Sequence, residues 1–458
     1  MRWINKLNET NTVAETLAAA SRRRFLQGGL SAGVSAGAAS LLRVPKAGLT
    51  LWQTMRSALG PDVASAGNPV DLGRYFLILR TQGNCGMDVT LGLDPWTDPR
   101  RPPATDMFIE YQDGDVIRKG GIALGPSAAG LAPHAAQCAV VNGILVSEND
   151  NGHDGAMTYM STGDGTGKAP DLAGELAVSS PSGAYGVLVT DGIHTADRVF
   201  RSSRFGDVTV ALDAPDLADA IARLLPKDRR TPLQGAQEEV VDADAVTKAL
   251  LETLRGWRAA GQPMDDERVA AAAFLSGACR QAQLSMEASG NLDTHANHVG
   301  NHLSAQKSIW DRVASIFDLF KSLPYGISGD SLFDRTTFLV YNEFSRTPAL
   351  DAAGGKNHNP LTNSVLLAGH AVRGGLTFGS SRLIGAQASV TGRSYHMGAP
   401  LDWSTGRPAA SREGAEFIFP ENLIRSCAQL HGADLRLFHS VAAGVKPIPG
   451  MFARAGGH

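Results

Sequence analysis

The sequence lacks the charge imbalance, the cysteine motifs and the long apolar runs that mark several classes of protein. Its 42 basic and 45 acidic residues nearly balance, and no basic stripe is present, which argues against a nucleic-acid partner. The four cysteines are scattered and form no CxxC pair, so no zinc knuckle or redox motif is evident. No apolar run suits a stable membrane span. A composition of 43% hydrophobic and 19% charged residues is that of an ordinary globular protein.

The amino terminus carries a paired arginine followed by a weakly apolar run. SRRRFLQ (residues 21–27) precedes GGLSAGVSAGAASLL, and together they match a twin-arginine export signal. A basic cap on an internal helix is the alternative interpretation. We therefore expect residues 1–69 to be a signal and leader. The expected location is periplasmic or extracellular, reached in folded form through the twin-arginine translocation machinery.

Apolar runs of strand length alternate with stretches of helical spacing. The predicted buried strands are residues 74–80, 138–145, 335–344 and 363–369. The predicted helices are residues 214–225, 242–257, 266–286 and 304–323. This alternation predicts an α/β layered fold with a mostly parallel sheet. We expect one domain over residues 70–458, with a helix-rich insertion near 213–289.

Each predicted strand leads into a loop whose side chains can bind a metal ion or an oxyanion. In an open parallel sheet, functional residues gather beyond the carboxyl ends of the strands. The candidates are Asp88, His153 in NGHDGA, Asp293 and His295 in NLDTHANHVGNH, and Glu343, Arg346 and His358 in NEFSRTPALDAAGGKNHNP. A mixed Asp/Glu/His set drawn from several strand ends is what a two-metal phosphoester or sulfate-ester site requires.

Each candidate also has a purely structural interpretation. Asp88 could hold a turn, and His153 could be a solvated loop residue. Glu343 and Arg346 could form a buried ion pair. His302 could lie on the exposed face of a helix, and we expect it to be a surface residue of this kind. Only the joint occurrence of these residues at strand ends favours a functional site.

Several of these motifs resemble the twin-arginine-exported family called domain of unknown function 1501, over about residues 74–437. DTHANH resembles its D-T-H-A/G-N-Q or -N, and NEFSRTP resembles its E-F-G-R-T-P. GGKNHNP resembles its G-G-R-D-H-x-P, with Asn357 where relatives have aspartate. The family is grouped with alkaline phosphatases and sulfatases. The resemblance therefore implies an alkaline-phosphatase-like three-layer α/β/α sandwich with divalent metal ions (zinc, manganese, magnesium or calcium) above the strand ends.

The resemblance also implies roles for individual residues. The implied metal ligands are Asp88, Asp293, His295, Glu343 and His358. The implied catalytic candidates are His153, Arg346, which would steady the loop or a substrate oxyanion, and Thr90, the hydroxyl nearest to Asp88. His298 would form a hydrogen bond to a metal ligand without binding the metal itself. The sequence NCGMD lacks the C-x-P-x-R sulfatase signature, which argues against a formylglycine nucleophile.

Two functions are compatible with these motifs. The first is an exported metal-dependent hydrolase that acts on a phosphate or sulfate ester, either a small molecule or a component of the cell envelope. The second is a non-catalytic envelope protein that uses the same scaffold as a binding surface. Another transfer reaction on envelope carbohydrate or lipid is a third, weaker hypothesis.

Overall fold

A computed structural model describes most of the chain after residue 73. The described residues are 74–82, 85–97, 107–147, 152–166, 168–179, 187–189, 202–224, 243–326, 329–384, 395–409, 416–433 and 444–452. The predicted signal and leader, residues 1–69, lie outside them. No helix in the described residues is both long and apolar enough to cross a membrane.

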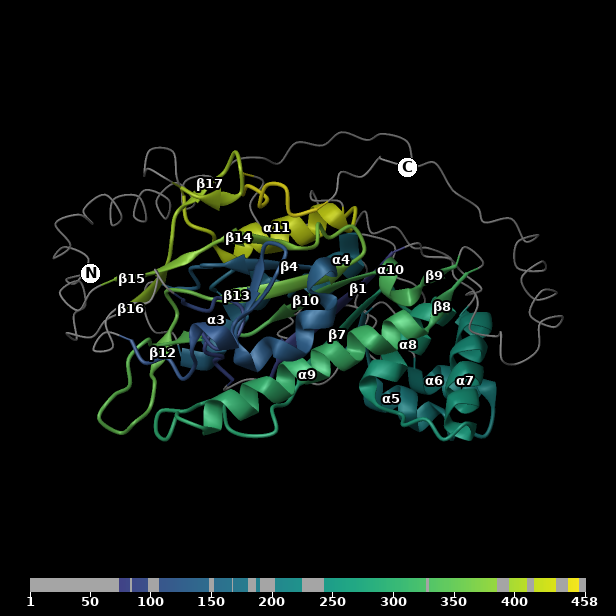
Figure 1. Cartoon of the computed structure of the whole chain (residues 1–458). Helices are drawn as coiled ribbons and strands as arrows, with labels where there is room; N and C mark the ends of the chain where they lie inside the picture. Colours follow the sequence, from purple (N-terminus) through teal and green to yellow (C-terminus); the bar gives the residue numbers. More distant parts are fainter. Residues whose placement is uncertain are drawn as a thin grey trace.

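A mixed, mostly parallel sheet forms the centre of the molecule (Figure 1). Its strands, in spatial order, are β14 (Leu376–Gly379), β4 (Cys138–Asn142), β13 (Ser364–Gly369), β10 (Thr336–Tyr341), β1 (Tyr75–Thr81), β7 (Gln281–Met286), β5 (Val187–Val189) and β6 (Ser202–Arg204). Strand β13 is antiparallel to both of its neighbours, whereas the other neighbouring pairs are parallel. The α/β class and the mostly parallel sheet are therefore confirmed.

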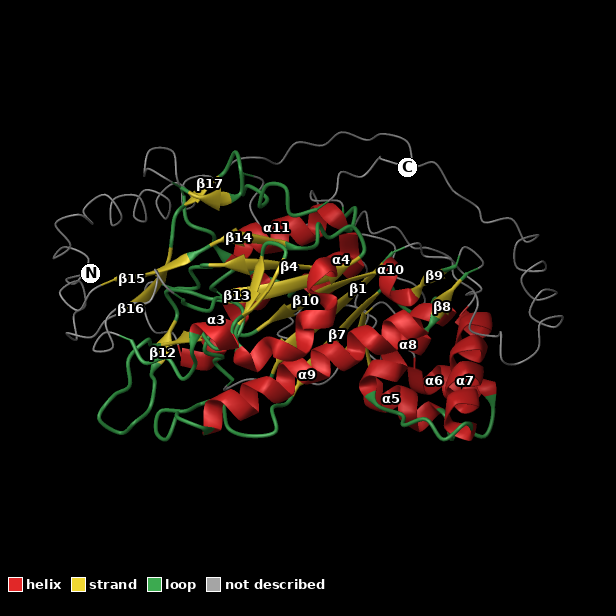
Figure 2. Cartoon of the chain, in the orientation of Figure 1, coloured by secondary structure: helices red, strands yellow, loops and turns green. Residues whose placement is uncertain are grey.

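Helices cover both faces of this sheet (Figure 2). Because side chains alternate along a strand, Leu77 of β1 faces one apolar cluster and Ile78 faces the other. The helices of the first cluster include α7 (Ala243–Ala259), α8 (Asp266–Ser276), α9 (Asn301–Ser322) and the 3₁₀ helix η4 (Pro126–Gln137). The helices of the second are α3 (Gly152–Thr162), α4 (Leu172–Ser179) and α11 (Pro420–Leu430).

Shorter elements complete the described structure. The remaining helices are η3 (Asp113–Asp115), α5 (Phe205–Ala211), α6 (Leu217–Leu224) and α10 (Leu332–Arg335). The small antiparallel pairs are β2 (Ile117–Lys119) with β3 (Ile122–Leu124), β8 (Pro324–Tyr325) with β9 (Asp330–Ser331), β11 (Ser345–Arg346) with β12 (His358–Asn359), β15 (Ser381–Ile384) with β16 (Tyr395–Gly398), and β17 (Leu401–Asp402) with β18 (Arg407–Pro408). Of these, the pair β11–β12 matters most for the site.

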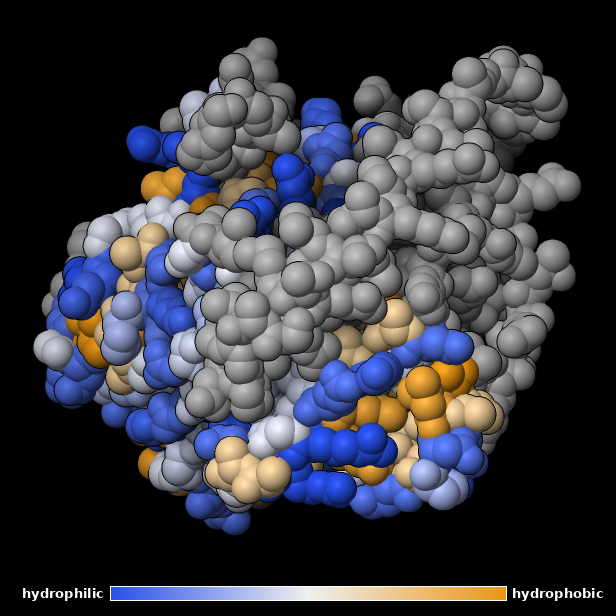
Figure 3. Space-filling view, turned by 90° about the vertical axis from the view of Figure 1, so that its right-hand side faces the viewer, coloured by the Kyte–Doolittle hydropathy of each residue, from blue (hydrophilic) through white to orange (hydrophobic). Residues whose placement is uncertain are grey.

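The helices α5, α6 and α7 gather at the opposite end of the molecule from β12 (Figure 1). Hydrophobic residues are visible on part of this end, beside hydrophilic ones (Figure 3). Val210 of α5 and Leu217 of α6 are large apolar side chains that are exposed. The predicted insertion, residues 213–289, contains helices of this group, but it also contains β7 of the central sheet. The inserted unit stays a prediction, and β7 within its range belongs to the central sheet.

Two further predictions are corrected by the structure. Residues 266–286 are not one helix, because Gly277 adopts a left-handed conformation (φ 72°) that ends α8, and the chain then enters β7. The run 363–369 is a strand, but its antiparallel direction points its carboxyl end away from the edge where the other candidate loops lie.

Candidate metal centre

The carboxyl ends of β1, β4, β7 and β10 lie at one edge of the sheet, since these strands run in the same direction. The chain after β4 reaches His153 at the start of α3, and the loop after β7 carries Asp293 and His295. The segment after β10 carries Glu343 and then His358 on β12. The sequence pattern and the topology thus bring the candidate loops together.

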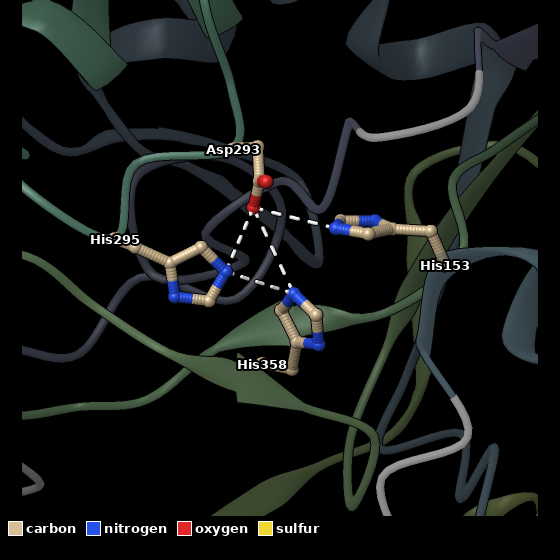
Figure 4. Close-up of side chains that lie close together, drawn as sticks. All are labelled: His153, Asp293, His295 and His358. Atoms are coloured by element: carbon tan, nitrogen blue, oxygen red, sulfur yellow. Dashed lines mark hydrogen bonds and ion pairs between the residues drawn. The ribbon is translucent and has the colours of Figure 1, made fainter.

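Four of the predicted residues converge on one point, and we call them the outer cluster: His153, Asp293, His295 and His358 (Figure 4). Their ligand atoms all lie within 4.8 Å of one another. Asp293 Oδ1 is 3.3 Å from His153 Nε2, 3.1 Å from His295 Nε2 and 3.7 Å from His358 Nε2. Four ligands on bonds of about 2.0–2.1 Å in a tetrahedron would be about 3.3–3.4 Å apart. The three distances from Asp293 are close to this value, and the wider separations among the histidines require the rings to move inward around an ion.

The hydrogen bonds behind two of the histidines aim their Nε2 lone pairs into the cluster. His153 Nδ1 donates to the Glu343 carboxylate, so in the neutral ring Nε2 is the nitrogen without a proton. His295 Nδ1 lies 3.0 Å from Asn357 Oδ1, which can only accept a hydrogen bond. Nδ1 of the neutral His295 ring therefore carries the proton, and Nε2 does not. His295 Nε2 lies 3.0 Å from His358 Nε2, and two such nitrogens need a proton or a cation between them. The nearly buried His153 Nε2 has no hydrogen-bond partner in the described structure. These features suit a bound cation.

Two loops interlock to place His295 beside His358. The Lys356 amide donates to Thr294 O at 3.0 Å, and the His298 amide donates to Gly354 O at 2.9 Å. A Cβ atom on Gly355 would lie 1.9 Å from the carbonyl oxygen of His295, so only glycine allows this approach. The backbone of the two loops therefore sets the spacing of these two ligands.

Arg346 ties three loops together and is fully buried. Its Nε donates to Gly86 O at 2.9 Å, and its Nη2 donates to Leu292 O and to Asp293 Oδ1, each at 2.8 Å. Its Nη1 donates to Lys356 O at 3.4 Å. Burial raises the pKa of Asp293, but the Arg346 guanidinium outweighs it, so the net pKa is lowered. Arg346 thus steadies the loops, and its guanidinium is engaged with them rather than directed at a substrate oxyanion.

Glu343 lies behind the outer cluster rather than in it. Its side chain is 0% exposed, and its Oε1 accepts from the Cys85 amide at 2.9 Å as well as from His153. Burial lowers the pKa of His153, but the hydrogen bond and charge of Glu343 outweigh it, so the net pKa of His153 is raised. The carboxylate therefore acts on His153, and Arg346 is not its hydrogen-bond partner.

Asp88 belongs to a second, buried group that we call the inner cluster: Asp88, Glu110, Thr294, His298, His302 and Lys356. Lys356 Nζ lies 2.5 Å from Asp88 Oδ2 and also donates to Phe108 O at 3.1 Å. Burial alone would raise the pKa of Asp88, but Lys356 and the nearby histidines hold it well below its ordinary value. An ammonium group therefore balances the carboxylate predicted to bind metal.

A chain of hydrogen bonds fixes the proton positions in the inner cluster. The Asp88 amide donates to His302 Nε2 at 3.0 Å, so the His302 proton is on Nδ1 and faces Thr294 Oγ1 at 2.9 Å. The Thr294 hydroxyl then donates to His298 Nδ1 at 2.8 Å. His298 Nε2 consequently carries a proton toward Asp88 and Glu110, each 3.7 Å away. Burial lowers the pKa of His298 to about 2 and that of His302 to about 3, so both rings are neutral.

The inner cluster changes two further assignments made from the sequence and adds a residue that had none. The hydroxyl of Thr90 donates to Asp88 Oδ1 at 2.7 Å and its side chain is buried, so it does not face the outer cluster as a nucleophile would. His302 is fully buried, and its prediction as a surface histidine is wrong because its ring joins this network. Lys356 was not among the candidates, although its place between two glycines and His358 in GGKNHNP was a usable signal.

Comparison with known proteins agrees with part of the motif evidence. The model of the family described as "Protein of unknown function (DUF1501)" matches residues 207–397. This match supports the family that the motifs resemble, and its range contains Asp293, His295 and His358 but not His153. No curated protein matches the sequence.

Proposed function

We propose that the protein is a metal-dependent hydrolase of phosphate or sulfate esters that binds one divalent cation in the outer cluster. The observation that carries the proposal is the convergence of three imidazole nitrogens and one carboxylate oxygen within 4.8 Å, at the carboxyl edge of the sheet. A nitrogen-rich donor set favours zinc or a similar transition metal over magnesium or calcium. Within the described residues only one such cluster exists, so we replace the expected pair of ions with one.

The cation, when bound, would supply Lewis-acid polarisation of an ester oxygen. The residues around it have separate tasks. His153, Asp293, His295 and His358 hold the ion, and Arg346 fixes Asp293 by a hydrogen bond of 2.8 Å. His295 is the most exposed of the four, with 44% of its side chain accessible, so an ester would approach from its side. Because the Thr90 hydroxyl is engaged with Asp88, we propose that water attacks the ester directly and that no covalent threonine intermediate forms.

The remaining expectations belong to the same proposal. The motifs and the helices on both sheet faces support an alkaline-phosphatase-like α/β/α sandwich. The paired arginine of residues 21–27 supports export in folded form through the twin-arginine pathway to the periplasm or the cell exterior. An envelope-derived or small-molecule ester would be the substrate.

A non-catalytic metal-dependent binding protein of the envelope is the second candidate. The observation in its favour is that two of the predicted catalytic groups, Thr90 and Arg346, are buried and engaged with other protein groups. Fold and metal binding alone do not establish turnover.

A substrate panel distinguishes the two functions. Purified protein loaded with zinc or manganese is incubated with aryl phosphate mono- and diesters and aryl sulfates, beside a His358→Ala variant and a chelated sample. Metal-dependent release of the phenol that His358→Ala abolishes is the expected result. Stoichiometric metal binding with no release from any ester would favour the non-catalytic protein.

A further inference from the structure

Different chemical groups lie behind two histidines of the outer cluster. His153 Nδ1 donates to a carboxylate, that of Glu343. His295 Nδ1 donates to a neutral amide oxygen, that of Asn357, at 3.0 Å. The two rings otherwise present the same atom, Nε2, to the same Asp293 oxygen, at 3.3 and 3.1 Å. The difference between them therefore lies behind the ligands.

The Glu343 carboxylate is held between the Cys85 amide and the ring of His153. Its Oε1 accepts from both the Cys85 amide and His153 Nδ1, and its side chain is fully buried. Its Oε2 has no hydrogen-bond partner in the described structure, and Arg346 donates to other groups. Neither metal ligation nor an ion pair with Arg346 accounts for this position.

An anionic acceptor at Nδ1 fixes the orientation and tautomer of an imidazole and increases electron density at its Nε2. A neutral amide fixes the tautomer but increases that density less, because it carries no charge. The surroundings add to the contrast, since the side chain of His153 is 14% exposed and that of His295 is 44% exposed. The less exposed of the two histidines is thus the one with the charged partner.

We propose that Glu343 is a positioning residue that makes His153 the strong ligand of the cation, and that Asn357 leaves His295 as the weaker ligand on the solvent side. The inference rests on the proposed metal site. An incoming ester or water would therefore compete for the cation most easily on the His295 side of the cluster.

The test compares metal affinities and a proton position. Zinc dissociation constants are measured at one pH by chelator competition for the whole protein and for Glu343→Gln, Asn357→Asp and Glu421→Gln. Glu421 is the matched control, because it is another buried carboxylate that accepts a hydrogen bond from α3, through Tyr159 at 2.5 Å. Nitrogen-15 NMR of the metal-free wild type, at a pH high enough for the ring to be neutral and with His153→Gln for assignment, reports which nitrogen of His153 carries the proton.

Glu343→Gln should weaken zinc binding about 10- to 100-fold, the usual effect of removing a partner behind a ligand. Asn357→Asp should tighten it by up to about 10-fold, and Glu421→Gln should leave it unchanged. The proton of His153 should be on Nδ1. These results would support the inference.

Other outcomes overturn it in distinguishable ways. A wild type that binds zinc while Glu343→Gln binds equally well, or a His153 proton on Nε2, would remove this inference and leave the metal site standing. Equal losses of zinc affinity in Glu343→Gln and Glu421→Gln would show a general effect on α3. That result would also remove this inference. An unchanged or lower zinc affinity in Asn357→Asp would remove the assignment of His295 as the weaker ligand. A wild type that binds no zinc would remove the proposed site and the inference together.

Discussion

The outer and inner clusters share two loops, the one after β7 and the one that leads into β12, but differ in what balances their charges. Side chains alternate between them along the chain: Asp293 and His295 enter the outer cluster, whereas Thr294 and His298 enter the inner one. In the inner cluster a lysine supplies the positive charge, and the Asp88 amide and the Thr294 hydroxyl fix the proton positions. In the outer cluster the Nε2 atoms of His295 and His358 face each other, and the Arg346 guanidinium contacts Asp293. The comparison teaches that histidines and carboxylates alone do not identify a metal site.

This difference predicts that inner substitutions destabilise the fold and outer ones impair metal binding. Four substitutions or conditions test it, in order of their expected effect on the unfolding free energy of the metal-free protein.

Lys356→Met should have the largest effect, because it leaves the buried Asp88 charge without its partner. Breaking a buried ion pair from one side costs about 3–5 kcal/mol. Urea unfolding of the chelated protein measures it. The control is Lys307→Met, which removes the exposed Lys307–Asp311 pair on α9 and should cost less than about 1 kcal/mol. Equal costs for the two variants would contradict a stabilising inner ion pair.

Gly355→Ala should affect both clusters through the junction of the two loops. The added Cβ would meet the His295 carbonyl at 1.9 Å, so the loops must separate. Overpacking of this kind costs about 1–3 kcal/mol, and zinc affinity should fall as well. Gly114→Ala, where a Cβ would meet no atom within 4 Å, is the control. An unchanged zinc affinity in Gly355→Ala would show that the junction does not set the ligand spacing.

The pH dependence of unfolding should identify the neutral histidines of the inner cluster. Burial lowers the pKa of His302 to about 3, so between about pH 6.5 and that value the unfolded chain binds the extra proton. The unfolding free energy should therefore fall as the pH falls, by up to about 1.4 kcal/mol per pH unit for this group. His153, whose pKa is raised, contributes with the opposite sign. Denaturation curves at several pH values should give a shallower slope for His302→Gln than for wild type, and equal slopes would refute a buried neutral ring.

His295→Ala should have the smallest effect on the fold and a clear effect on the ion. Its side chain is 44% exposed, so the chelated variant should unfold within about 1 kcal/mol of wild type. The zinc affinity of the variant should fall at least about 10-fold, because the substitution removes a metal ligand itself and not only a residue that hydrogen-bonds to a ligand. Competition with a chelator measures the affinity. A variant that loses stability without losing zinc would reverse the assignment of this histidine.

The sequence was informative where local pattern and topology agree. Apolar runs predicted β1, β4, β10 and β13, and the expected strand-end loops do bring His153, Asp293, His295 and His358 together. The pattern failed at β7, because QAQLSM has no continuous apolar run and follows an alanine-rich helix.

The sequence could not separate the two clusters. Asp88 and Asp293 are both carboxylates after strands, and only their three-dimensional partners, Lys356 for one and Arg346 with three histidines for the other, distinguish them. His302 looked like a surface residue because helical spacing does not reveal that Thr294 and the Asp88 amide meet its ring. Such contacts depend on loops that are far apart in the chain.

The most direct test of the two-cluster account is the metal content of the purified, folded protein after equilibration with zinc. The account predicts one tightly bound ion per chain in the wild type and none in His153→Ala, with both proteins folded by circular dichroism. No bound ion in the wild type, two ions per chain, or an ion that persists in His153→Ala would contradict it.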